Sequence, residues 1–403
     1  MRGSPMTPRE NFLLAMSHRQ PEWVPIDMGK HIGSIHRLAY PVLRDHLGNV
    51  PMTNGPRILD RMAQTVVPDE ALLQRLHVDF RWVVPHWVQV RERTDAAGYV
   101  DMWGVPYRAT EHAEHYAVDG APLKSAVTID DIEDYAWPDP EDDGQFQGLR
   151  ERARHLYEDT GYVVGADAIK AGPLMTALQM RGYEQFFMDL VSEPEFADAL
   201  LGKITALLMR MWERYLAEVG EYVQIAYVTD DLGTQTSLLL SPKVFRRHIE
   251  PRMKELHDLI KSRANVKLMM HSDGAVGPLL ADFVEMGVDI LNPVQTSVRG
   301  LEDTGALKES YGDRLGFHGS IDVQQLMPNA TPEEVRWEVA KRMHDLGPNG
   351  GLIIAPCHNL GPDIPPENLV TLFDAAHELG RYPLDLDSVL AGQASYFARH
   401  AGK

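Results

Sequence analysis

The chain has 403 residues and a formal charge of −19, because 58 acidic residues outnumber 39 basic ones. Such a charge repels the phosphate backbone of nucleic acids and anionic lipid surfaces, so neither nucleic acid nor membrane is expected as a partner. Cys357 is the one cysteine, which excludes an intrachain disulfide, and no apolar stretch is long enough to span a bilayer, so we expect a cytoplasmic protein.

Eight short apolar runs, separated by longer segments of helical spacing, predict a parallel sheet wrapped by helices. In chain order, the predicted strands cover residues 23–28, 78–84, 162–168, 222–228, 266–270, 288–291, 314–317 and 351–355. Eight is the number of strands that a closed (β/α)8 barrel needs. The sequence therefore predicts an α/β protein of the (β/α)8 TIM barrel class.

Helices are predicted between the strands where a start signal precedes a helical pattern. Residues 184–219 contain a helical pair, residues 242–263 begin at a Ser-Pro start, and residues 331–345 open with Thr-Pro-Glu-Glu. Residues 88–110 interrupt the pattern, because alternating residues on both sides of Asp95-Ala-Ala-Gly98 predict a β-hairpin inserted after the second strand.

The domain organisation is expected to be simple. The sequence contains no repeat, low-complexity tract or linker that would separate two domains. We therefore expect one barrel domain over residues 1–403, with a core of about 7–385 and a hairpin insertion of about 88–116.

Polar side chains follow each predicted strand. They are Lys30 and His31, His86, Asp167 and Lys170, Asp230 and Asp231, His271 and Asp273, Asn292 and Gln295, His318 and Asp322, and Cys357 with His358 and Asn359. In a barrel these positions converge on one mouth, where barrel enzymes build their sites. A simpler interpretation is that Asp, Asn and Gly follow strands because they suit turns and helix caps. That interpretation does not explain why histidine and cysteine occur beside the carboxylates.

Three of these residues have the chemistry of a metal site. His271 and Asp273 are two residues apart at a strand end, and the barrel would bring Cys357 to the same mouth. Imidazole, carboxylate and thiolate are all ligands of Zn²⁺, and three protein ligands leave the open position that catalysis requires. The alternative is that Cys357 is a small buried apolar residue and His271 a hydrogen-bonded core residue.

Several short motifs in order resemble the uroporphyrinogen decarboxylase superfamily, most strongly over residues 222–382. They are Thr229-Asp-Asp-Leu-Gly-Thr-Gln235, Leu240-Ser-Pro-Lys-Val-Phe245, His271-Ser-Asp-Gly, Gly287-Val-Asp-Ile-Leu-Asn-Pro-Val-Gln295, His318-Gly-Ser-Ile-Asp322, Thr331-Pro-Glu-Glu-Val335 and Asp363-Ile-Pro-Pro-Glu-Asn368. The superfamily contains porphyrin-pathway decarboxylases and zinc-dependent methyltransferases that serve corrinoid proteins. The resemblance implies a barrel enzyme that often forms homodimers.

Two departures from the family patterns favour the methyltransferase branch. The decarboxylases carry an Arg-Gln-Ala-Gly-Arg-Tyr segment whose arginines bind substrate carboxylates, whereas this chain has Gly29-Lys-His-Ile-Gly-Ser-Ile-His-Arg-Leu-Ala-Tyr40. Lys30 or His31 cannot replace a bidentate guanidinium pair, so a tetrapyrrole octacarboxylate is not expected as the substrate. The methyltransferases hold zinc with His-x-Cys and a distant Cys. His271 and Cys357 match the outer ligands, while Asp273 stands in place of the first Cys, which favours oxygen over sulfur as the activated atom.

The resemblance implies a role for each site residue. His271, Asp273 and Cys357 would hold one Zn²⁺ per chain, and Asp231, with Asp230, would act as acid–base or orient a ligand. The residues expected to bind substrate are Asn292, Gln295, His358, Asp167, and, as anion contacts, Lys30 and His31. One of Asp230 and Asp231 is expected to cap the following turn. His358 is an alternative metal ligand, but neighbouring residues on a strand point to opposite faces.

Three functions follow from this interpretation. The first is a zinc-dependent methyltransferase or demethylase that moves a methyl group from a small O-methyl substrate to the cobalt(I) corrinoid of a partner protein. The second is a metal-free decarboxylase or lyase of a non-porphyrin acid, in which Asp231 stabilises a protonated intermediate. The third is a non-catalytic barrel that binds a corrinoid or tetrapyrrole.

Overall fold

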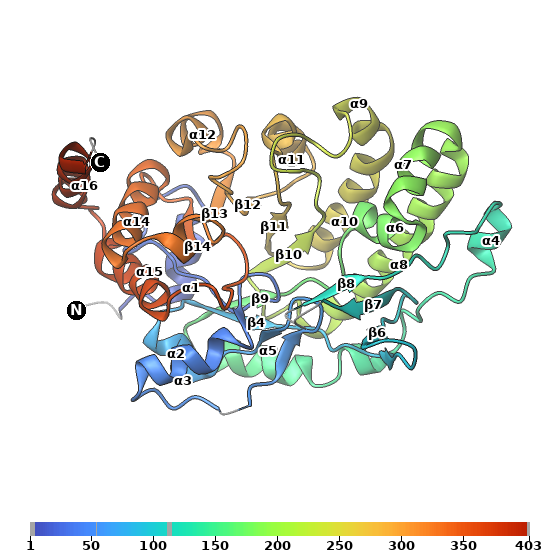
Figure 1. Cartoon of the computed structure of the whole chain (residues 1–403), viewed down its shortest axis with the longest axis horizontal. Helices are drawn as coiled ribbons and strands as arrows, with labels where there is room; N and C mark the ends of the chain where they lie inside the picture. Colours follow the sequence, from blue (N-terminus) through green and yellow to red (C-terminus); the bar gives the residue numbers. More distant parts are fainter. Residues whose placement is uncertain (1–4, 54, 111–114, 401–403) are drawn as a thin grey trace.

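The computed structural model describes residues 5–53, 55–110 and 115–400. Its centre is a curled sheet of seven parallel strands in the order β14-β13-β12-β11-β10-β9-β4 (Figure 1). These strands are β4 (Phe80–Val83), β9 (Val163–Ala166), β10 (Ile225–Thr229), β11 (Lys267–His271), β12 (Ile290–Asn292), β13 (Gly316–Ile321) and β14 (Leu352–Pro356). Nearly all of their residues are buried, as expected for a parallel sheet covered by helices. Seven of the eight predicted strands are therefore confirmed in an α/β fold that resembles a TIM barrel.

The first predicted strand, residues 23–28, forms only isolated bridges. Ile354 N donates to Pro25 O, Asp27 N donates to Ile354 O, and Asp79 N donates to Ile26 O. Pro25 has no N–H to donate, which limits the pairing to these few bonds. The segment nevertheless lies between β14 and the residue preceding β4, so it joins the two edges of the curled sheet.

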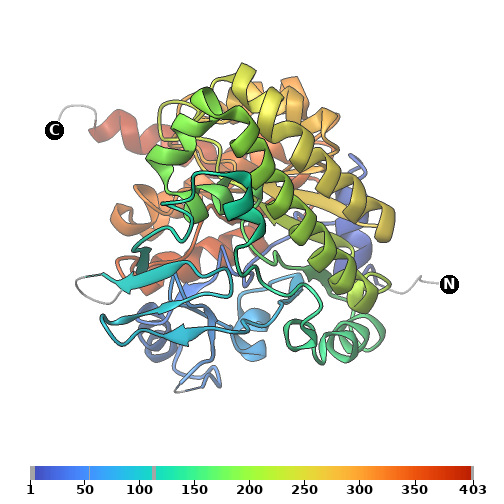
Figure 2. The same cartoon turned by 90° about the vertical axis from the view of Figure 1, so that its right-hand side faces the viewer.

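The described helices include those predicted over residues 184–219, 242–263 and 331–345. Their bounds are α1 (Pro8–Ala15), α2 (Ala39–Leu47), α3 (Glu70–Arg75), α4 (Ile129–Glu133), α5 (Leu149–Glu158), α6 (Pro173–Arg181), α7 (Tyr183–Ser192), α8 (Pro194–Val219), α9 (Pro242–Val244), α10 (Glu250–Arg263), α11 (Leu280–Glu285), α12 (Thr304–Tyr311), α13 (Leu326–Asn329), α14 (Pro332–Leu346), α15 (Pro366–Leu379) and α16 (Asp387–His400). Thr331 and Glu334 form a capping box at the start of α14. Figure 2 shows the long helices α8 and α10 side by side on the outside of the molecule.

The helix predicted over residues 242–263 contains an irregular turn. A π-helical segment, Phe245–Ile249, separates α9 from α10, and Pro251 follows it. A proline cannot donate the i→i−4 hydrogen bond, so its position favours a local change of helical pairing. Two 3-10 turns, Asp143–Gln145 and Gly277–Leu279, complete the helical elements of the described residues.

The insertion after β4 is larger than the single hairpin that the sequence predicts. It is a four-stranded antiparallel sheet of β5 (Arg91–Glu92), β6 (Gly98–Val100), β7 (Pro106–Ala109) and β8 (Tyr116–Val118). Tyr99 of β6 is paired with Tyr107 of β7, and their rings stack at 4.7 Å. Residues 111–114, within the predicted insertion, lie outside the described residues. A small sheet of β1 (Ile35–His36), β3 (Thr65–Val66) and β2 (Ile58–Asp60) lies in the segment before β4.

Within the described part of the chain, none of the helices has both the length and the apolar character needed to span a bilayer.

Candidate functional site

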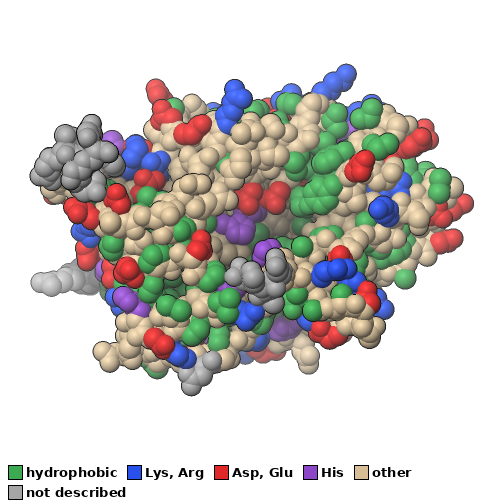
Figure 3. Space-filling view, in the orientation of Figure 1, with side chains coloured by type: hydrophobic (Ala, Val, Ile, Leu, Met, Phe, Trp, Pro, Cys, Tyr) green, Lys and Arg blue, Asp and Glu red, His purple; other side chains and the backbone are tan. Residues whose placement is uncertain are grey.

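The polar residues that follow the strands meet at the carboxyl end of the sheet. His271 is the last residue of β11, and it is in register with Thr229 at the end of β10 and with Asn292 at the end of β12. The common register places the loops after these strands around one opening. Figure 3 shows a hollow in this face with histidine and acidic side chains gathered at it.

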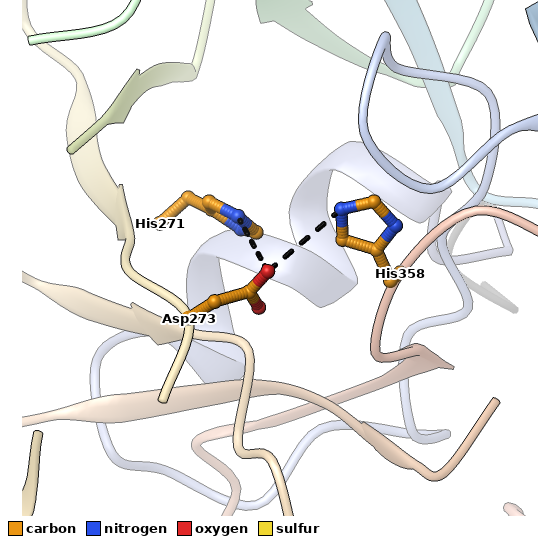
Figure 4. Close-up of side chains that lie close together, drawn as sticks. All are labelled: His271, Asp273 and His358. Atoms are coloured by element: carbon orange, nitrogen blue, oxygen red, sulfur yellow. Dashed lines mark ion pairs between the residues drawn. The ribbon is translucent and has the colours of Figure 1, made fainter. Parts of the chain in front are cut away.

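Three side chains at this opening point toward one another (Figure 4). Asp273 Oδ2 lies 3.8 Å from Nε2 of His271 and 3.8 Å from Nε2 of His358. One ligand atom from each of these residues lies within 4.8 Å of the other two. His271 is buried, whereas Asp273 and His358 are partly exposed, so the group opens toward solvent on one side.

A buried chain of hydrogen bonds fixes the ring of His271. Its Nδ1–H donates to Asn292 Oδ1 at 2.7 Å, and Asn292 Nδ2 donates to His318 Nδ1 at 2.6 Å. His318 Nε2–H then donates to Asp27 Oδ2 at 2.8 Å, and Lys30 Nζ donates to the same oxygen at 3.4 Å. Because Nδ1 of His271 donates to Asn292, the other ring nitrogen, Nε2, lies on the side of the two carboxylates, 3.7 Å from Asp231 Oδ1 and 3.8 Å from Asp273 Oδ2.

The charges in this chain are set by burial and by neighbouring groups. Burial opposes ionisation of Asp27, but the charge of Lys30 and hydrogen bonds from His318 and Trp82 outweigh it and lower the pKa of Asp27. Burial, with the charge of Lys30, lowers the pKa of His318 to about 4. His318 is therefore neutral near pH 7, which matches its role as acceptor at Nδ1 and donor at Nε2.

Asp230 and Asp231 have different positions. Asp230 is buried and accepts hydrogen bonds from Leu174 N and Met175 N in the first turn of α6, and burial raises its pKa to about 7. Asp231 accepts from Asp273 N at 3.0 Å, lies 3.7 Å from His271 Nε2 and is partly exposed. The structure thus places Asp230 at the start of α6, which precedes it in the chain, and not at the turn that follows it, whereas Asp231 lies beside the three clustered side chains.

His358, and not Cys357, belongs to the described cluster. The Cys357 thiol is buried and donates to Val294 O at 3.3 Å. Burial, together with the charges of Asp322 and Asp273, raises the pKa of this thiol well above its ordinary value, which disfavours the thiolate that binds metals. Cys357 and His358 lie in a bend after β14, where the thiol contacts Val294 O and the imidazole lies beside Asp273. The described cluster thus contains His358 where the sequence predicts Cys357.

The other predicted site residues lie around the cluster or beneath it. Lys30 is buried against Asp27, so its charge is directed into the core and not toward an anion at the opening. His31 Nδ1 lies 2.6 Å from Asp167 Oδ1. Burial opposes protonation of His31, but the charge and hydrogen bond of Asp167 outweigh it and raise the pKa of His31. Gln295 Oε1 accepts from Gly274 N, which holds the loop that carries Asp273.

A cavity of about 200 Å³ adjoins the cluster. His271, His358 and Asp231 contribute to one part of its lining, and a larger apolar part includes Met62, Val84, Trp87, Met102, Trp103 and Met175. Among the described lining residues, the acidic ones are Asp60, Asp101, Asp230 and Asp231, the lysine is Lys170, and there is no arginine. The cavity therefore suits a partly apolar molecule and not a polycarboxylate.

Three polar residues of the cavity wall were not assigned a role from sequence. Lys170 Nζ donates to Asp101 Oδ2 at 2.9 Å and lies 3.4 Å from the Tyr107 hydroxyl. Burial opposes the charge on Lys170, but Tyr107 and Asp101 raise its pKa. Asp101 directly follows β6 and Tyr107 lies in β7, so both belong to the insertion after β4. The signal available in the sequence was the occurrence of Asp101 and Tyr107 among the apolar residues of 99–107.

The family model and the curated relatives that match this chain have the same name. Residues 115–379 match the family model described as Uroporphyrinogen decarboxylase (URO-D). The chain is 26% identical over 268 residues to uroporphyrinogen decarboxylase of Alkalilimnicola ehrlichii, covering 64% of this chain and 68% of the relative. It is 26% identical over 273 residues to the Psychromonas ingrahamii protein of the same name, covering 65% and 72%.

One solved structure shares the fold over most of the chain. A methyltransferase from Methanosarcina mazei superposes with a TM-score of 0.62 at 17% sequence identity, covering 93% of this chain and 99% of that one. At this level of identity the likeness shows a common fold.

Proposed function

The chain belongs to the uroporphyrinogen decarboxylase family, and on that premise we propose that it is a metal-dependent methyltransferase or demethylase. It would move a methyl group from the oxygen of a small methylated substrate to a corrinoid protein. The observation that carries this proposal is the cluster of His271, Asp273 and His358 beside a cavity without a described arginine. The fold shared with a methyltransferase supports the same assignment.

The clustered side chains fit a zinc ion. In a tetrahedral zinc site, nitrogen and oxygen ligands about 2.0–2.1 Å from the metal lie roughly 3.3 Å from one another. The distances of 3.8 Å from Asp273 Oδ2 to the two imidazole nitrogens are close to this value. Zn²⁺ bound by His271, Asp273 and His358 would supply Lewis-acid stabilisation of the leaving oxygen.

The protein's own groups orient the site and handle the proton. Asn292 holds His271 so that Nε2 faces the cluster, and Asp231 holds the Asp273 loop through the Asp273 amide. Asp231 also lines the cavity, so its carboxyl group can hold or deliver a proton at the oxygen that loses the methyl group. The apolar part of the cavity orients the substrate and excludes water from the reacting atoms.

A decarboxylase is the second candidate, because the curated relatives carry that name at 26% identity. In this alternative Asp231 would stabilise a protonated intermediate without a metal. The acidic lining of the cavity makes a substrate with many carboxylates unfavourable. Release of CO₂ from a candidate acid by the metal-free protein would favour this reaction over methyl transfer.

The proposal is tested by metal analysis and by methyl transfer. Protein purified without chelators should contain about one zinc per chain, and it should demethylate an O-methyl substrate in the presence of a reduced corrinoid protein. His271→Ala should lose both the zinc and the activity. Full activity in zinc-free protein, or in the His271→Ala variant, would contradict the proposal.

A further inference from the structure

The hydrogen-bonded chain behind His271 ends at a buried ion pair. Asp27 and Lys30 are both buried, and Lys30 Nζ lies 3.4 Å from Asp27 Oδ2. The other carboxylate oxygen, Oδ1, accepts from Trp82 Nε1 at 2.9 Å, while Oδ2 lies 2.8 Å from His318 Nε2. The proposed reaction gives this ion pair no role. Buried charges are unfavourable unless they are paired, so a pair at the end of this chain calls for a physical explanation.

The ionised carboxylate of Asp27 fixes the proton of His318. Burial opposes the ionisation of Asp27, but the charge of Lys30 outweighs it and lowers the pKa of this carboxyl group. A carboxylate has no hydrogen to donate, so His318 Nε2 must carry the proton that lies between the two groups. A neutral imidazole has a single N–H, and burial lowers the pKa of His318 to about 4. Nδ1 of His318 is therefore an acceptor.

The proton on His318 decides how the amide of Asn292 is turned. The amide atom 2.6 Å from His318 Nδ1 must be a donor, so it is the nitrogen, and the oxygen faces His271. This orientation follows from the proton on His318 and not from the two amide atoms themselves, which are alike in size. The Tyr227 hydroxyl, 3.1 Å from the amide oxygen, can donate or accept and is compatible with either turn. Because the oxygen can only accept, His271 Nδ1 carries a proton.

A neutral donor in place of the carboxylate would reverse the chain. If the group at residue 27 donates to His318 Nε2, the proton of His318 lies on Nδ1 and the amide oxygen of Asn292 turns toward it. The amide nitrogen then donates to His271 Nδ1, and a neutral His271 carries its proton on Nε2. That atom lies 3.8 Å from Asp273 Oδ2. Its lone pair would no longer be available to a metal ion held with Asp273.

We propose that Asp27 is a positioning residue, which sets the tautomer of His271 through the two side chains between them. The sheet register brings Asn292 beside His271, and Asp27 decides which amide atom faces the imidazole. The charge of Lys30 is directed into the core because it keeps this carboxylate ionised. That the resulting tautomer serves a metal ion rests on the proposed function.

The test reads the position of the proton in metal-free protein. NMR spectroscopy of protein with 15N-labelled histidine distinguishes protonated from unprotonated ring nitrogens, and His271→Gln identifies the signals of His271. The spectra are recorded at pH 8, above the ordinary histidine pKa of about 6.5. In the wild-type protein, Nδ1 of His271 should carry a proton.

The decisive variant is Asp27→Asn combined with Lys30→Met, which removes both buried charges together. The Trp82 indole N–H then takes the amide oxygen of the new side chain, which leaves its amide nitrogen facing His318. The proton of His271 should therefore move from Nδ1 to Nε2. A proton that stays on Nδ1 would overturn the proposal.

Zinc affinity gives a second readout. Competition with a chelator should show a 10- to 100-fold loss in the Asp27→Asn/Lys30→Met variant. The matched control is Asp189→Asn combined with Arg181→Met, which removes another buried ion pair, with an N–O distance of 2.7 Å, outside the described cavity lining. This control should change neither the zinc affinity nor the proton of His271. Equal losses in the two double variants would contradict the proposal.

A third variant tests the chain if the first double variant fails to fold. His318→Phe keeps both charges of the ion pair and removes the link to Asn292. The amide of Asn292 would then be free to turn, so His271 should show a mixture of the two tautomers. A single population with the proton on Nδ1 would show that Asp27 has no influence on His271.

The proton position and the reaction separate this inference from the proposed function. A proton that moves in the Asp27→Asn/Lys30→Met variant, in a protein that binds no zinc, would support the inference and reject the proposed function. Zinc binding and methyl transfer, with a proton that stays on Nδ1 of His271 in the same variant, would support the proposed function and reject the inference.

Discussion

His271 and Asn292 are neighbours in the sheet register and are also joined by a hydrogen bond of 2.7 Å between His271 Nδ1 and Asn292 Oδ1. Each is the last residue of its strand, β11 and β12. The pairing of two buried strands therefore fixes the tautomer and the direction of the histidine at the opening. His271, the most buried of the three clustered side chains, is therefore oriented by two strands of the sheet and not by a loop.

Removing this hydrogen bond should weaken metal binding. Asn292→Leu keeps the approximate volume but leaves His271 Nδ1 without its acceptor, so zinc affinity should fall by about 10- to 100-fold. Competition with a chelator would measure the change. Asn368→Leu is the control, because Asn368 is also buried but donates to Met327 O and Ala330 O away from the site. Equal losses in both variants would indicate general destabilisation.

Single substitutions distinguish two candidates for the third zinc ligand, His358 of the described cluster and Cys357 of the sequence prediction. His358→Ala should lower the zinc content strongly, because it removes one of the three clustered donors. Cys357→Ser should leave the zinc content nearly unchanged, since the thiol is bonded to Val294 O. Elemental analysis of the purified variants would decide. Loss of zinc in Cys357→Ser with retention in His358→Ala would restore Cys357 as the ligand.

Gly233 and Gly274 lie in close contact, and this contact sets the distance between the loops that carry Asp231 and Asp273. A Cβ on Gly274, whose φ is +93°, would lie 2.4 Å from the carbonyl carbon of Gly233. Gly274→Ala should therefore push apart the loops that carry the two carboxylates and lower the free energy of unfolding by about 1–3 kcal/mol, with loss of zinc. Gly300→Ala is a matched control, because its φ is +88° and no described atom lies within 4 Å of the added carbon. Denaturant unfolding should show a smaller loss for this control.

Asp79 should make stability depend on pH. It is buried and accepts from Trp23 Nε1 and Ile26 N, and burial raises its pKa to about 7. The folded protein then retains a proton that the unfolded chain loses above its ordinary pKa of about 4. The contribution of Asp79 to the free energy of unfolding is fully present below pH 4 and is lost as the pH rises to 7. At 1.4 kcal/mol per pH unit, the loss amounts to roughly 4 kcal/mol.

Unfolding experiments with Asp79→Asn between pH 4 and 7 would isolate this contribution, because the amide does not titrate. As the pH rises, the unfolding free energy of the wild-type protein should fall relative to that of this variant. A difference that is constant over this range would show that Asp79 keeps an ordinary pKa in the folded protein.

Most of the fold follows from local patterns. Apolar runs long enough for buried strands, and start signals such as Ser241-Pro and Thr331-Pro-Glu-Glu, are properties of neighbouring residues, so they can be read without coordinates. The strand predicted at residues 23–28 forms only isolated bridges, because Pro25 removes a donor. The insertion was underestimated, since pairing of β7 with β8 depends on contacts that a hairpin pattern does not contain.

The sequence by itself determined the order of the seven strands of the central sheet and the kinds of polar residue that follow them, because these depend on composition and spacing along the chain. Only the tertiary structure decided that His358 and not Cys357 faces His271 and Asp273, and that the inserted sheet brings Asp101 and Tyr107 to Lys170 at the cavity. The physical reason is that the side-chain directions in the bend after β14, like the contacts between distant segments, depend on how the whole chain packs.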